Sequence, residues 1–578
     1  MPRIMASRLF LPLIGRSRIG AFRLVQWTNY TTGPPPIGPI TTKMPYYRSE
    51  AELKADIDSM YTTAIDSVLP LNMVHKSLKV LDGNLVVNNK NYPLDRNVHV
   101  IGFGKAVLGM VRAVEEILGD HIVNGILSVP DGIQETFRQA GKTNLLLDPN
   151  SKVQVFEGSP NNIPDARAHE TAMKIYDMVK SLGPKDIVLT LITGGGSSLL
   201  PAPVPPLTLD QVVEVSQLMA KNGATIQQLN TVRKNLELLK GGGLAGAANP
   251  AKVVSLILSD VIGNSLDIIA SGPTVADYST PQQCLDCFES LGIMKKVPKE
   301  VLSLLEEEAV RRKLTKSISK QQTQLTFTSL SAAPMMGPVP NHDCQNANNI
   351  VVGSNAIAVE AAKKVADDLG YLTHVLDMEL DGEARRVGFM MSSLAEYICY
   401  VIGNMADCEN KRPLAELELE LIDMDLSKDK VNEMITLARS AANTGRPICI
   451  LSSGETIVNV KNKGRGGRNQ ELALSAAIHM KKHMFVGVRE SFDVLLLSLG
   501  TDGQDGPTPA AGAYAHLNSL QECATFIAEE YLENNDTYTF YSEANKGKDL
   551  IVTGMTGTNV MDFQILLIQQ KPNAAATE

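Results

Sequence analysis

The sequence contains no apolar run that approaches the roughly 18 residues needed to cross a bilayer. It also lacks the extremes of composition that mark collagenous or disordered chains, since 44% of its residues are hydrophobic and 20% are charged. These absences leave the class of ordinary globular proteins, with no membrane span. At 578 residues the chain is too long for a single core, so we expect about two to four domains.

Cysteine and histidine are too few and too scattered to suggest a metal site. The seven cysteines are an odd number, and Cys284 and Cys287 form one CLDC pair without a second pair or a histidine cluster nearby. A structural zinc site needs about four such ligands. We therefore expect free thiols in a reducing compartment, and the nine histidines form no recognisable nucleophilic triad.

Acidic residues are absent before Glu50, whereas the first 49 residues carry seven lysines and arginines interleaved with apolar residues. This pattern is typical of a mitochondrial presequence and breaks any secretory signal. We expect residues 1–45 to be such a presequence, or else a disordered tail, and the protein to be mitochondrial, or else cytoplasmic. Cleavage near residue 44 would remove six basic residues and take the formal net charge from −9 to −15, which disfavours nucleic acid as a partner.

Strand-like apolar runs recur along the chain, each ending in a glycine-rich or acidic turn that a helical pattern often follows. Strands buried on both faces read as continuous apolar runs, which is typical of parallel sheets covered by helices. The sequence therefore predicts an α/β fold built from βαβ units. The segments lie at 98–118, 186–200, 253–267, 349–371, 447–460 and 493–508.

The α/β pattern fails between about 314 and 348, where Ser, Gln, Pro and Asn dominate. We interpret residues 313–347 as a linker or insertion. It would separate an N-terminal domain at 46–312 from a C-terminal domain at 348–578.

The turn IGFGKAVLG, at 101–109, follows the first of the predicted strands. A dinucleotide fingerprint requires a third glycine where Val107 stands, so the G-x-G-x-x-G pattern fails. Lys105 instead lies in the first turn of the predicted helix, where backbone N–H groups and the helix dipole favour an anion. The alternative is a solvated lysine after a tight turn.

The turn TGGGSS follows the predicted strand at 186–192. Successive glycines let the backbone approach a ligand closely, and the two hydroxyl groups could contact phosphate or cap a helix, although a plain tight turn is also possible. No Walker A motif accompanies it. The candidate nucleotide-binding residues are Gly194, Gly195, Gly196, Ser197 and Ser198.

Acidic turns follow two other buried strands. Asp260, in LSDVIGN, could hold magnesium or take a proton from a hydroxyl group, and could equally cap a helix. Asp502 and Asp505, in LGTDGQDGPT, are candidate magnesium ligands. Acidic and glycine-rich turns at one edge of a sheet favour phosphoryl transfer over hydride transfer.

The stretch NKGRGGRNQE, at 462–471, holds three glycines ahead of a predicted helix. Arg465 and Arg468 offer planar forks for carboxylate or phosphate, and the glycines permit a backbone nest. Asn469 lies in the first turn and could reach the same ligand. We interpret Glu471 as a partner of the helix dipole rather than a catalytic residue.

Six motifs occur in the order found in the glycerate kinases that carry a C-terminal MOFRL domain, and the sequence resembles that family over about residues 50–570. They are IGFGKA, TGGGSSLLPAP, LNTVRKNLELLKGGGLA, LSDVIGN with IASGPT, KGRGGRNQELAL and GTDGQDGPTPAAGA. The resemblance implies an enzyme that transfers phosphate from ATP, with Mg²⁺, to D-glycerate, giving 2-phosphoglycerate or 3-phosphoglycerate. It also implies two α/β domains, a Rossmann-like αβα domain with a mostly parallel sheet and a MOFRL domain, with the active site in the cleft between them.

By position in these motifs, Lys105, Asp260 and Arg468 match the residues at the family's active centre. ATP phosphates would lie on the TGGGSS turn, with Lys105 balancing the charge that develops in transfer. Arg468 would hold the glycerate carboxylate, helped by Asn469 and Lys105, and exchanging the roles of Arg468 and Lys105 fits almost as well. Asp260 would orient or deprotonate the hydroxyl group, and Asp502 or Asp505 would hold Mg²⁺.

Two other functions fit parts of the same pattern. An oxidoreductase acting on hydroxypyruvate would share the scaffold and the small substrate, but the failed G-x-G-x-x-G counts against it. A non-catalytic ligand-binding protein of the same fold is the other alternative. A homodimer is possible in each case.

Overall fold

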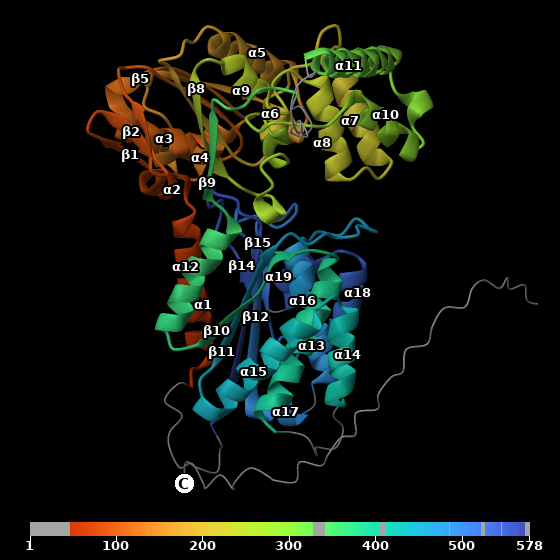
Figure 1. Cartoon of the computed structure of the whole chain (residues 1–578). Helices are drawn as coiled ribbons and strands as arrows, with labels where there is room; N and C mark the ends of the chain where they lie inside the picture. The colour runs from red at the N-terminus through yellow and green to blue at the C-terminus, as the bar shows by residue number, and fades with distance from the viewer. Residues whose placement is uncertain are drawn as a thin grey trace, which may run out of the picture. The chain divides into compact units, whose positions relative to one another are not determined.

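The computed structural model describes residues 47–326, 341–404, 412–484, 486–521, 526–544 and 546–572, so the predicted presequence at 1–45 lies outside the described residues. The described chain has an α/β fold with two six-stranded sheets and a small three-stranded one, which confirms the predicted fold class (Figure 1). None of its helices is long and apolar enough to cross a membrane.

The first sheet is parallel throughout, in the order β6-β5-β4-β7-β8-β9. On one face its side chains pack with α3, and on the other they pack with α5 and α9. The strands are β4 (Val98–Phe103), β5 (Ile122–Pro130), β6 (Val153–Gly158), β7 (Ile187–Ile192), β8 (Lys252–Leu258) and β9 (Ala347–Gly353), and the helices are α3 (Val107–Leu118), α5 (Ala166–Lys180) and α9 (Gly243–Ala248).

The strand order of the first sheet reverses at β4. The chain continues from β4 to β5 and β6 on one side, and then returns to β7, β8 and β9 on the other side. In open α/β sheets, ligands bind outside the carboxyl ends of the strands at such a switch point. The switch point here lies between the turns that hold Lys105 and Gly194.

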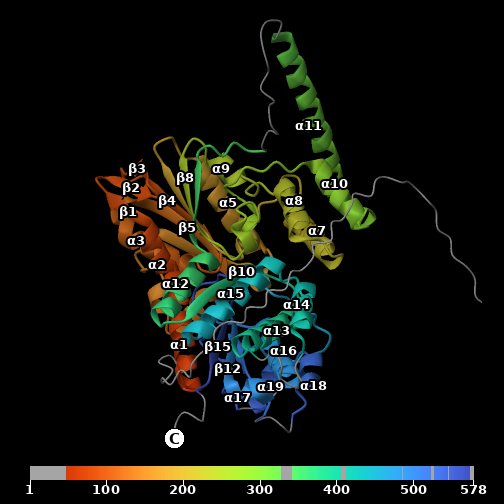
Figure 2. The ribbon, with the colours of Figure 1, turned by 60° about the horizontal axis from the view of Figure 1, so that its bottom comes forward.

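Helices α7, α8, α10 and α11 lie together beside the first sheet (Figure 2). Three of them begin with a capping box, in which Thr208, Thr225 or Thr280 exchanges hydrogen bonds with a glutamine three residues later. Helix α11 continues to Thr326, so the first part of the predicted linker at 313–347 is helical. The helices are α7 (Leu209–Lys221), α8 (Ile226–Leu236), α10 (Pro281–Ser290) and α11 (Lys299–Thr326).

The second sheet is mixed, in the order β10-β11-β15-β12-β13-β14, and only its β10–β11 pair is parallel. Its apolar runs match those expected of a parallel sheet because helices cover both faces, α13 and α16 on one and α1 and α12 on the other. The strands are β10 (Leu372–Leu380), β11 (Ile448–Gly454), β12 (Phe492–Gly500), β13 (Gly512–His516), β14 (Leu550–Ile551) and β15 (Asp562–Gln570), and the helices are α1 (Glu50–Ser67), α12 (Asn355–Asp368), α13 (Ala384–Ile402) and α16 (Arg468–His483).

Two segments do not belong to the sheet that their position in the sequence suggests. Helix α1 packs with the second sheet, where Tyr371 donates to Asp56 at 2.6 Å and Tyr514 donates to Asp58 at 3.3 Å. Strand β9 pairs with β8 of the first sheet. The structure therefore differs from the predicted boundaries, because residues after 46 belong with the C-terminal sheet and residues 347–353 with the N-terminal one.

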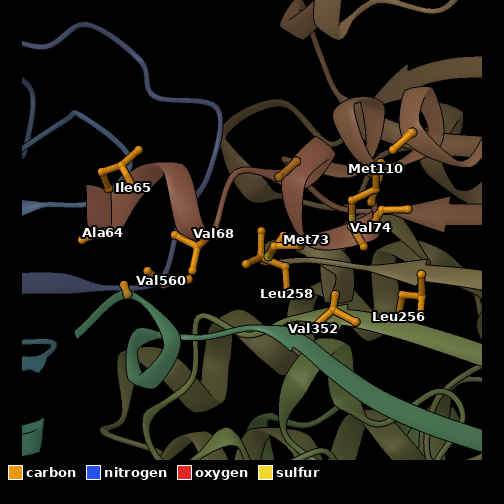
Figure 3. Close-up of a cluster of buried hydrophobic side chains, with 14 of the residues drawn as sticks. Ala64, Ile65, Val68, Met73, Val74, Met110, Leu256, Leu258, Val352 and Val560 are labelled. Atoms are coloured by element: carbon orange, nitrogen blue, oxygen red, sulfur yellow. The ribbon is translucent and has the colours of Figure 1, made fainter. Parts of the chain in front are cut away.

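A cluster of buried hydrophobic side chains includes residues of α1, of α2 (Pro70–Ser77) and of the short link between them. Val68 and Met73 lie at its centre (Figure 3). Val352 and Leu258 of the first sheet pack in the same cluster, as does Val560. A Cβ atom at Gly353 would lie 1.9 Å from the sulfur of Met73, so any larger residue there would force the Met73 side chain to move. This packing holds the end of β9 against the N-terminal helices.

Candidate active site

The turns after β4 and β7 are joined at the switch point of the first sheet. Gly104 has a φ of +137°, and a Cβ atom there would lie 2.2 Å from Thr193 Oγ1, so only glycine fits. Thr193 Oγ1 accepts a hydrogen bond from the Ala106 N–H at 3.1 Å, and the Lys105 N–H donates to the Gly194 carbonyl at 3.0 Å. The structure thus brings together Lys105 and the TGGGSS turn.

Asp260, after β8, lies directly against this turn. A Cβ atom at Gly194 would come within 2.0 Å of Asp260 Oδ2, so the glycine is what admits the carboxylate. Burial raises the pKa of Asp260 to about 6, and the nearby charge of Glu455 adds to this effect. A backbone hydrogen bond and Lys105 act in the opposite direction. Asp260 therefore titrates close to neutral pH, as a proton acceptor requires.

The side chain of Lys105 is exposed and extends beside Gly195, where a Cβ atom would lie 3.4 Å from its Cγ. Within the described residues its ammonium group has no carboxylate at ion-pair distance, although it acts on Asp260 through its charge. Lys105 is thus a cation beside the glycine turn that keeps its hydrogen-bonding capacity for a ligand.

A cavity of about 390 Å³ opens at this edge of the first sheet. Its lining includes the TGGGSS turn and Asp260, but also Arg233, Glu237 and Lys240. These three residues belong to the motif LNTVRKNLELLKGGGLA, to which the sequence analysis assigned no role. Their spacing along α8 and the turn after it does not reveal that they face a cavity.

The two predicted phosphate-binding hydroxyl groups contact the protein itself. Ser198 Oγ donates to the Gly195 carbonyl at 3.0 Å, and Ser197 Oγ lies 3.0 Å from Ser271 Oγ. Ala270 and Ser271 have φ values of +50° and +62°, which residues other than glycine rarely adopt. These contacts hold the glycine turn in one conformation, and Gly194 and Gly195 donate no backbone hydrogen bond within the described chain.

Arg468 is the first residue of α16, at the corresponding edge of the second sheet. Its Nε and Nη2 donate to the two oxygens of Asp562, at 2.6 and 2.9 Å, and its Nη1 donates to Glu455 at 2.7 Å. Asp562 is fully buried and lies between the ends of β11 and β12. Most of the fork that the sequence assigned to a glycerate carboxylate is therefore filled by the protein's own carboxylates.

Burial and pairing shift the pKa of both partners of this ion pair. Burial raises the pKa of Asp562 to about 6 even though the charge of Arg468 lowers it. Burial alone would lower the pKa of Arg468, but Asp562 and Glu455 outweigh it and the net shift is upward. Arg468 thus stays charged and is held in a fixed orientation.

The side chain of Asn469 is enclosed by the protein. It is fully buried, its Nδ2 donates to Asp562 at 3.1 Å, and its Oδ1 accepts from Ser498 at 2.6 Å. The predicted substrate-binding role is corrected to a structural one. Asn469 positions Asp562, which in turn positions Arg468.

Asp505 caps α16 and is not available as a magnesium ligand. Its two oxygens accept from the backbone N–H groups of Asn469, at 3.0 Å, and Gln470, at 2.9 Å, and the Gln470 amide adds a third donor at 2.9 Å. Asp502, the other predicted ligand, is partly exposed and lines a second cavity of about 610 Å³ with Glu455 and Arg468. Within the described residues no group of three or more His, Cys, Asp or Glu is placed to hold a metal.

The three glycines of NKGRGGRNQE pack against the protein itself. A Cβ atom at Gly464 would lie 2.3 Å from the Asn534 carbonyl, at Gly466 2.3 Å from Thr537 Oγ1, and at Gly467 2.2 Å from Asp505 Cγ. Packing within the protein therefore explains the three glycines, which the sequence analysis had assigned to a nest for a ligand. Of the two arginines in the stretch, Arg465 lies over the ring of Tyr538, 4.9 Å from its centre, rather than beside Arg468 at the cavity.

Glu471, in the same helix, is buried and accepts from Arg385 Nε at 2.5 Å and from Asn535 at 3.1 Å. It lies at the wall of the second cavity, but these partners occupy its oxygens. This agrees with a structural role and not with catalysis.

Comparison with known families identifies two regions of the chain. Residues 56–306 match the model of a domain of unknown function, DUF4147, and residues 448–562 match the MOFRL family. The first range contains Lys105, the glycine turn and Asp260, and the second contains Arg468 and Asp562.

Similar proteins cover nearly the whole chain. A glycerate kinase from Homo sapiens is 40% identical over 530 residues, which are 90% of this chain and 94% of that protein. A D-glycerate 2-kinase from Thermotoga maritima is 32% identical over 508 residues, 87% of this chain and 96% of that protein.

Solved structures agree with this likeness. The crystal structure of a glycerate kinase from Thermotoga maritima is similar with a TM-score of 0.65 at 30% identity, and covers 90% of this chain and 100% of that one. A protein from Pyrococcus horikoshii is similar with a TM-score of 0.65 at 28% identity, covering 90% of this chain and 99% of that one.

Proposed function

The chain belongs to the glycerate kinase family, and on that basis we propose that it transfers the γ-phosphoryl group of ATP to D-glycerate, giving ADP and 2-phosphoglycerate. The name of the Thermotoga maritima relative, a D-glycerate 2-kinase, favours the 2-hydroxyl group over the alternative product 3-phosphoglycerate. The observation that carries the proposal is the contact of Asp260 with Gly194, beside Lys105, at the switch point of the first sheet.

The glycine turn and Lys105 supply the positive environment that phosphoryl transfer needs. The free N–H groups of Gly194 and Gly195 would bind phosphate oxygens, and Lys105 would neutralise charge on the transferred group. Because the turn is held by its own hydrogen bonds, little reorganisation accompanies the reaction.

Asp260 would accept the proton of the glycerate hydroxyl group. Its pKa of about 6 leaves it ionised above that pH and basic enough to share the proton as the new bond to phosphorus forms. The contact with Gly194 places it next to the turn that would hold the phosphates. Its carboxylate is therefore in position to align the acceptor with the nucleotide.

The glycerate carboxylate would bind the N–H groups of Arg468 that do not bind Asp562 or Glu455. Three of the five guanidinium donors are used by Asp562 and Glu455, so the Nε side of the fork is occupied and one N–H on each terminal nitrogen is left. Lys105 is the other cation that could take this role.

Magnesium ions, which in kinases bridge the phosphates and neutralise their charge, usually bind one or two carboxylates besides the phosphates. Both predicted ligands line the second cavity, but the oxygens of Asp505 already accept hydrogen bonds from the start of α16, whereas Asp502 is not held by that helix. We therefore assign the ion's protein contact to Asp502.

Release of ADP from MgATP on addition of D-glycerate tests the activity, with L-glycerate and hydroxypyruvate plus NADH as controls. The proposal expects ADP formation that requires D-glycerate. Oxidation of NADH with hydroxypyruvate, without ADP formation, would assign the protein to the oxidoreductases instead.

Location and assembly are separate parts of the proposal. The basic, acid-free start of the sequence supports import into mitochondria. A fusion of residues 1–45 to a fluorescent protein should enter mitochondria, and a diffuse cytoplasmic signal would contradict this. The homodimer stays a prediction, which sedimentation equilibrium would check.

A further inference from the structure

The cavity at the first sheet contains a positive charge without a counter-ion. Lys240 is almost fully buried and forms an ion pair with Glu237, whose other oxygen accepts from the Ala202 N–H at 3.1 Å. Glu237 is thereby used by Lys240 and the backbone. Arg233, on the same wall, has no hydrogen bond or ion pair within the described part of the chain.

Arg233 is partly buried, and burial lowers its pKa despite the charge of Glu237. An arginine guanidinium does not lose its proton in proteins, so Arg233 stays a fixed positive charge at the wall of the cavity. Its nearest acidic neighbour is already neutralised by Lys240, whereas Lys234, one residue on, pairs with Asp267 at 3.2 Å. The charge of Arg233 is therefore directed to a ligand.

Part of the cavity wall is apolar. Leu209, Val212 and Val213 of α7 line it, and so does Ile226, the first residue of α8, which is 46% exposed. A cavity with an apolar wall and a few fixed polar groups is the usual form of a nucleotide site, and about 390 Å³ lies within the usual range. One end suits a flat aromatic base and the other suits phosphates.

Helix α8 is tied to the glycine turn by a buried hydrogen-bond chain. Ser271 Oγ donates to Asn230 Oδ1 at 2.9 Å and lies 3.0 Å from Ser197 Oγ. Asn230 precedes Arg233 by one helical turn, so the chain sets the position of Arg233 relative to the turn. The cation and the free N–H groups of the turn thus belong to one preorganised surface.

The second cavity has more acidic than basic residues in its wall. Glu455, Glu471, Asp502 and Asp505 line it, against Arg468 alone. In the first cavity the two cations Arg233 and Lys240 balance Glu237 and Asp260, so the phosphates of a nucleotide meet less negative charge there than in the second cavity.

We propose, resting on the kinase function above, that the cavity between the glycine turn, α7 and α8 is the nucleotide site, that Arg233 binds its phosphates, and that Leu209, Val212 and Val213 contact its base. Lys240 and Glu237 fix the floor beneath the phosphates. Arg233 touches the nucleotide and not the acceptor.

Arg233→Gln tests this assignment, with Arg112→Gln as the matched control, since Arg112 lies on α3 and pairs with Glu116 at 3.3 Å. Loss of a charged hydrogen bond to phosphate should raise the KM for ATP and the Kd for ADP about 10- to 100-fold. The KM for D-glycerate should stay within about twofold. Without ligand, Arg233→Gln should melt no lower than the wild type, because an unpaired buried cation is removed.

Val213→Trp is a second variant, which would fill the apolar end. It should weaken ADP binding in calorimetry and leave inorganic tripolyphosphate binding unchanged, whereas Arg233→Gln should weaken both. Unchanged ADP affinity in both variants, or a rise in the KM for D-glycerate alone in Arg233→Gln, would overturn the proposal. Wild-type protein that binds ADP through Arg233 but phosphorylates no glycerate would support this site and contradict the proposed function.

Discussion

Asp260 and Asp505 follow similar apolar strands, yet their surroundings give them different chemistry. Asp260 contacts the Gly194 backbone and has a pKa raised to about 6. Asp505 is surrounded by the N–H groups that begin α16. Both acidic turns could be identified from the sequence. Which of the two carboxylates would accept hydrogen bonds from the start of a helix could not be predicted, because that depends on a contact between residues 35 positions apart.

Asp260→Asn should reduce kcat by about 10²- to 10⁴-fold, because the amide cannot accept the hydroxyl proton. The KM for ATP should change little. In the wild type, kcat/KM for D-glycerate should fall about tenfold per pH unit below about 6 and level off above it. Steady-state kinetics between pH 5 and 8 check this, and a profile unaffected by the substitution would assign the proton acceptor elsewhere.

The same shift has a consequence for stability. The folded-state pKa of about 6 lies above the ordinary 3.8, so the folded protein binds the proton more tightly. The contribution of the protonated Asp260 to the free energy of unfolding is complete below pH 3.8 and is lost between that pH and about 6. Asp260→Asn should therefore raise the melting temperature at pH 7.5 more than at pH 4, as calorimetry would show.

Asp562 should be worth more to the fold than Glu455, although both pair with Arg468. Asp562→Asn leaves a partly buried guanidinium without its main counter-ion and should cost about 2 kcal/mol, below the value for a fully buried pair because Arg468 is 33% exposed. Glu455→Gln removes a pair that is 45% exposed on the carboxylate side and should cost less than about 0.5 kcal/mol. Equal losses in urea unfolding would contradict this account of Arg468.

Helix α16 begins where it does because Gly467 admits the carboxylate of Asp505. The φ of Gly467 is −150°, which any residue can adopt, so the need for glycine comes from the 2.2 Å approach of Asp505 Cγ. The glycine-rich stretch and the helix after it could be predicted from sequence. The group that fills the loop could not, because it arrives from the turn after β12.

Asp505→Ala removes this cap and should lower the free energy of unfolding by about 2 kcal/mol, through the lost cap and the buried N–H groups left unpaired. The Mg²⁺ concentration that gives half-maximal activity should not change. Asp502→Ala is the matched control, which should raise that concentration and leave stability within about 0.5 kcal/mol. A Mg²⁺ dependence that moves with Asp505 instead would restore the metal role that the sequence suggested.

Apolar runs located β4, β7 and β8 of the first sheet and β11 and β12 of the second, but not the direction of the strands in the second sheet. Strands β11, β12 and β15 are buried on both faces, so their sequences match those of parallel strands, although β15 runs antiparallel to its two neighbours. Periodicity reports which faces are covered. It does not report the path by which the chain returns.

At the scale of the whole molecule, the assignment of segments to sheets escaped prediction for a similar reason. Helix α1 is N-terminal in sequence but fills a face of the C-terminal sheet through Ile57 and Met60. A chain that begins at Pro70 should therefore be poorly soluble, because it exposes Leu495 and Leu497, whereas one that begins at Tyr47 should fold. Solubility and circular dichroism of the two chains would compare them, and equal stability would show that α1 is dispensable.

The central claim is transfer of phosphate from ATP to the 2-hydroxyl group of D-glycerate by residues around Asp260. Phosphorus NMR of the products from D-glycerate and MgATP, with the wild type and Asp260→Asn side by side, tests it most directly. We predict signals of ADP and 2-phosphoglycerate in equal amounts with the wild type, and almost none with the variant. A 3-phosphoglycerate signal would contradict the choice of hydroxyl group, and no phosphorylated glycerate from the wild type would contradict the function itself.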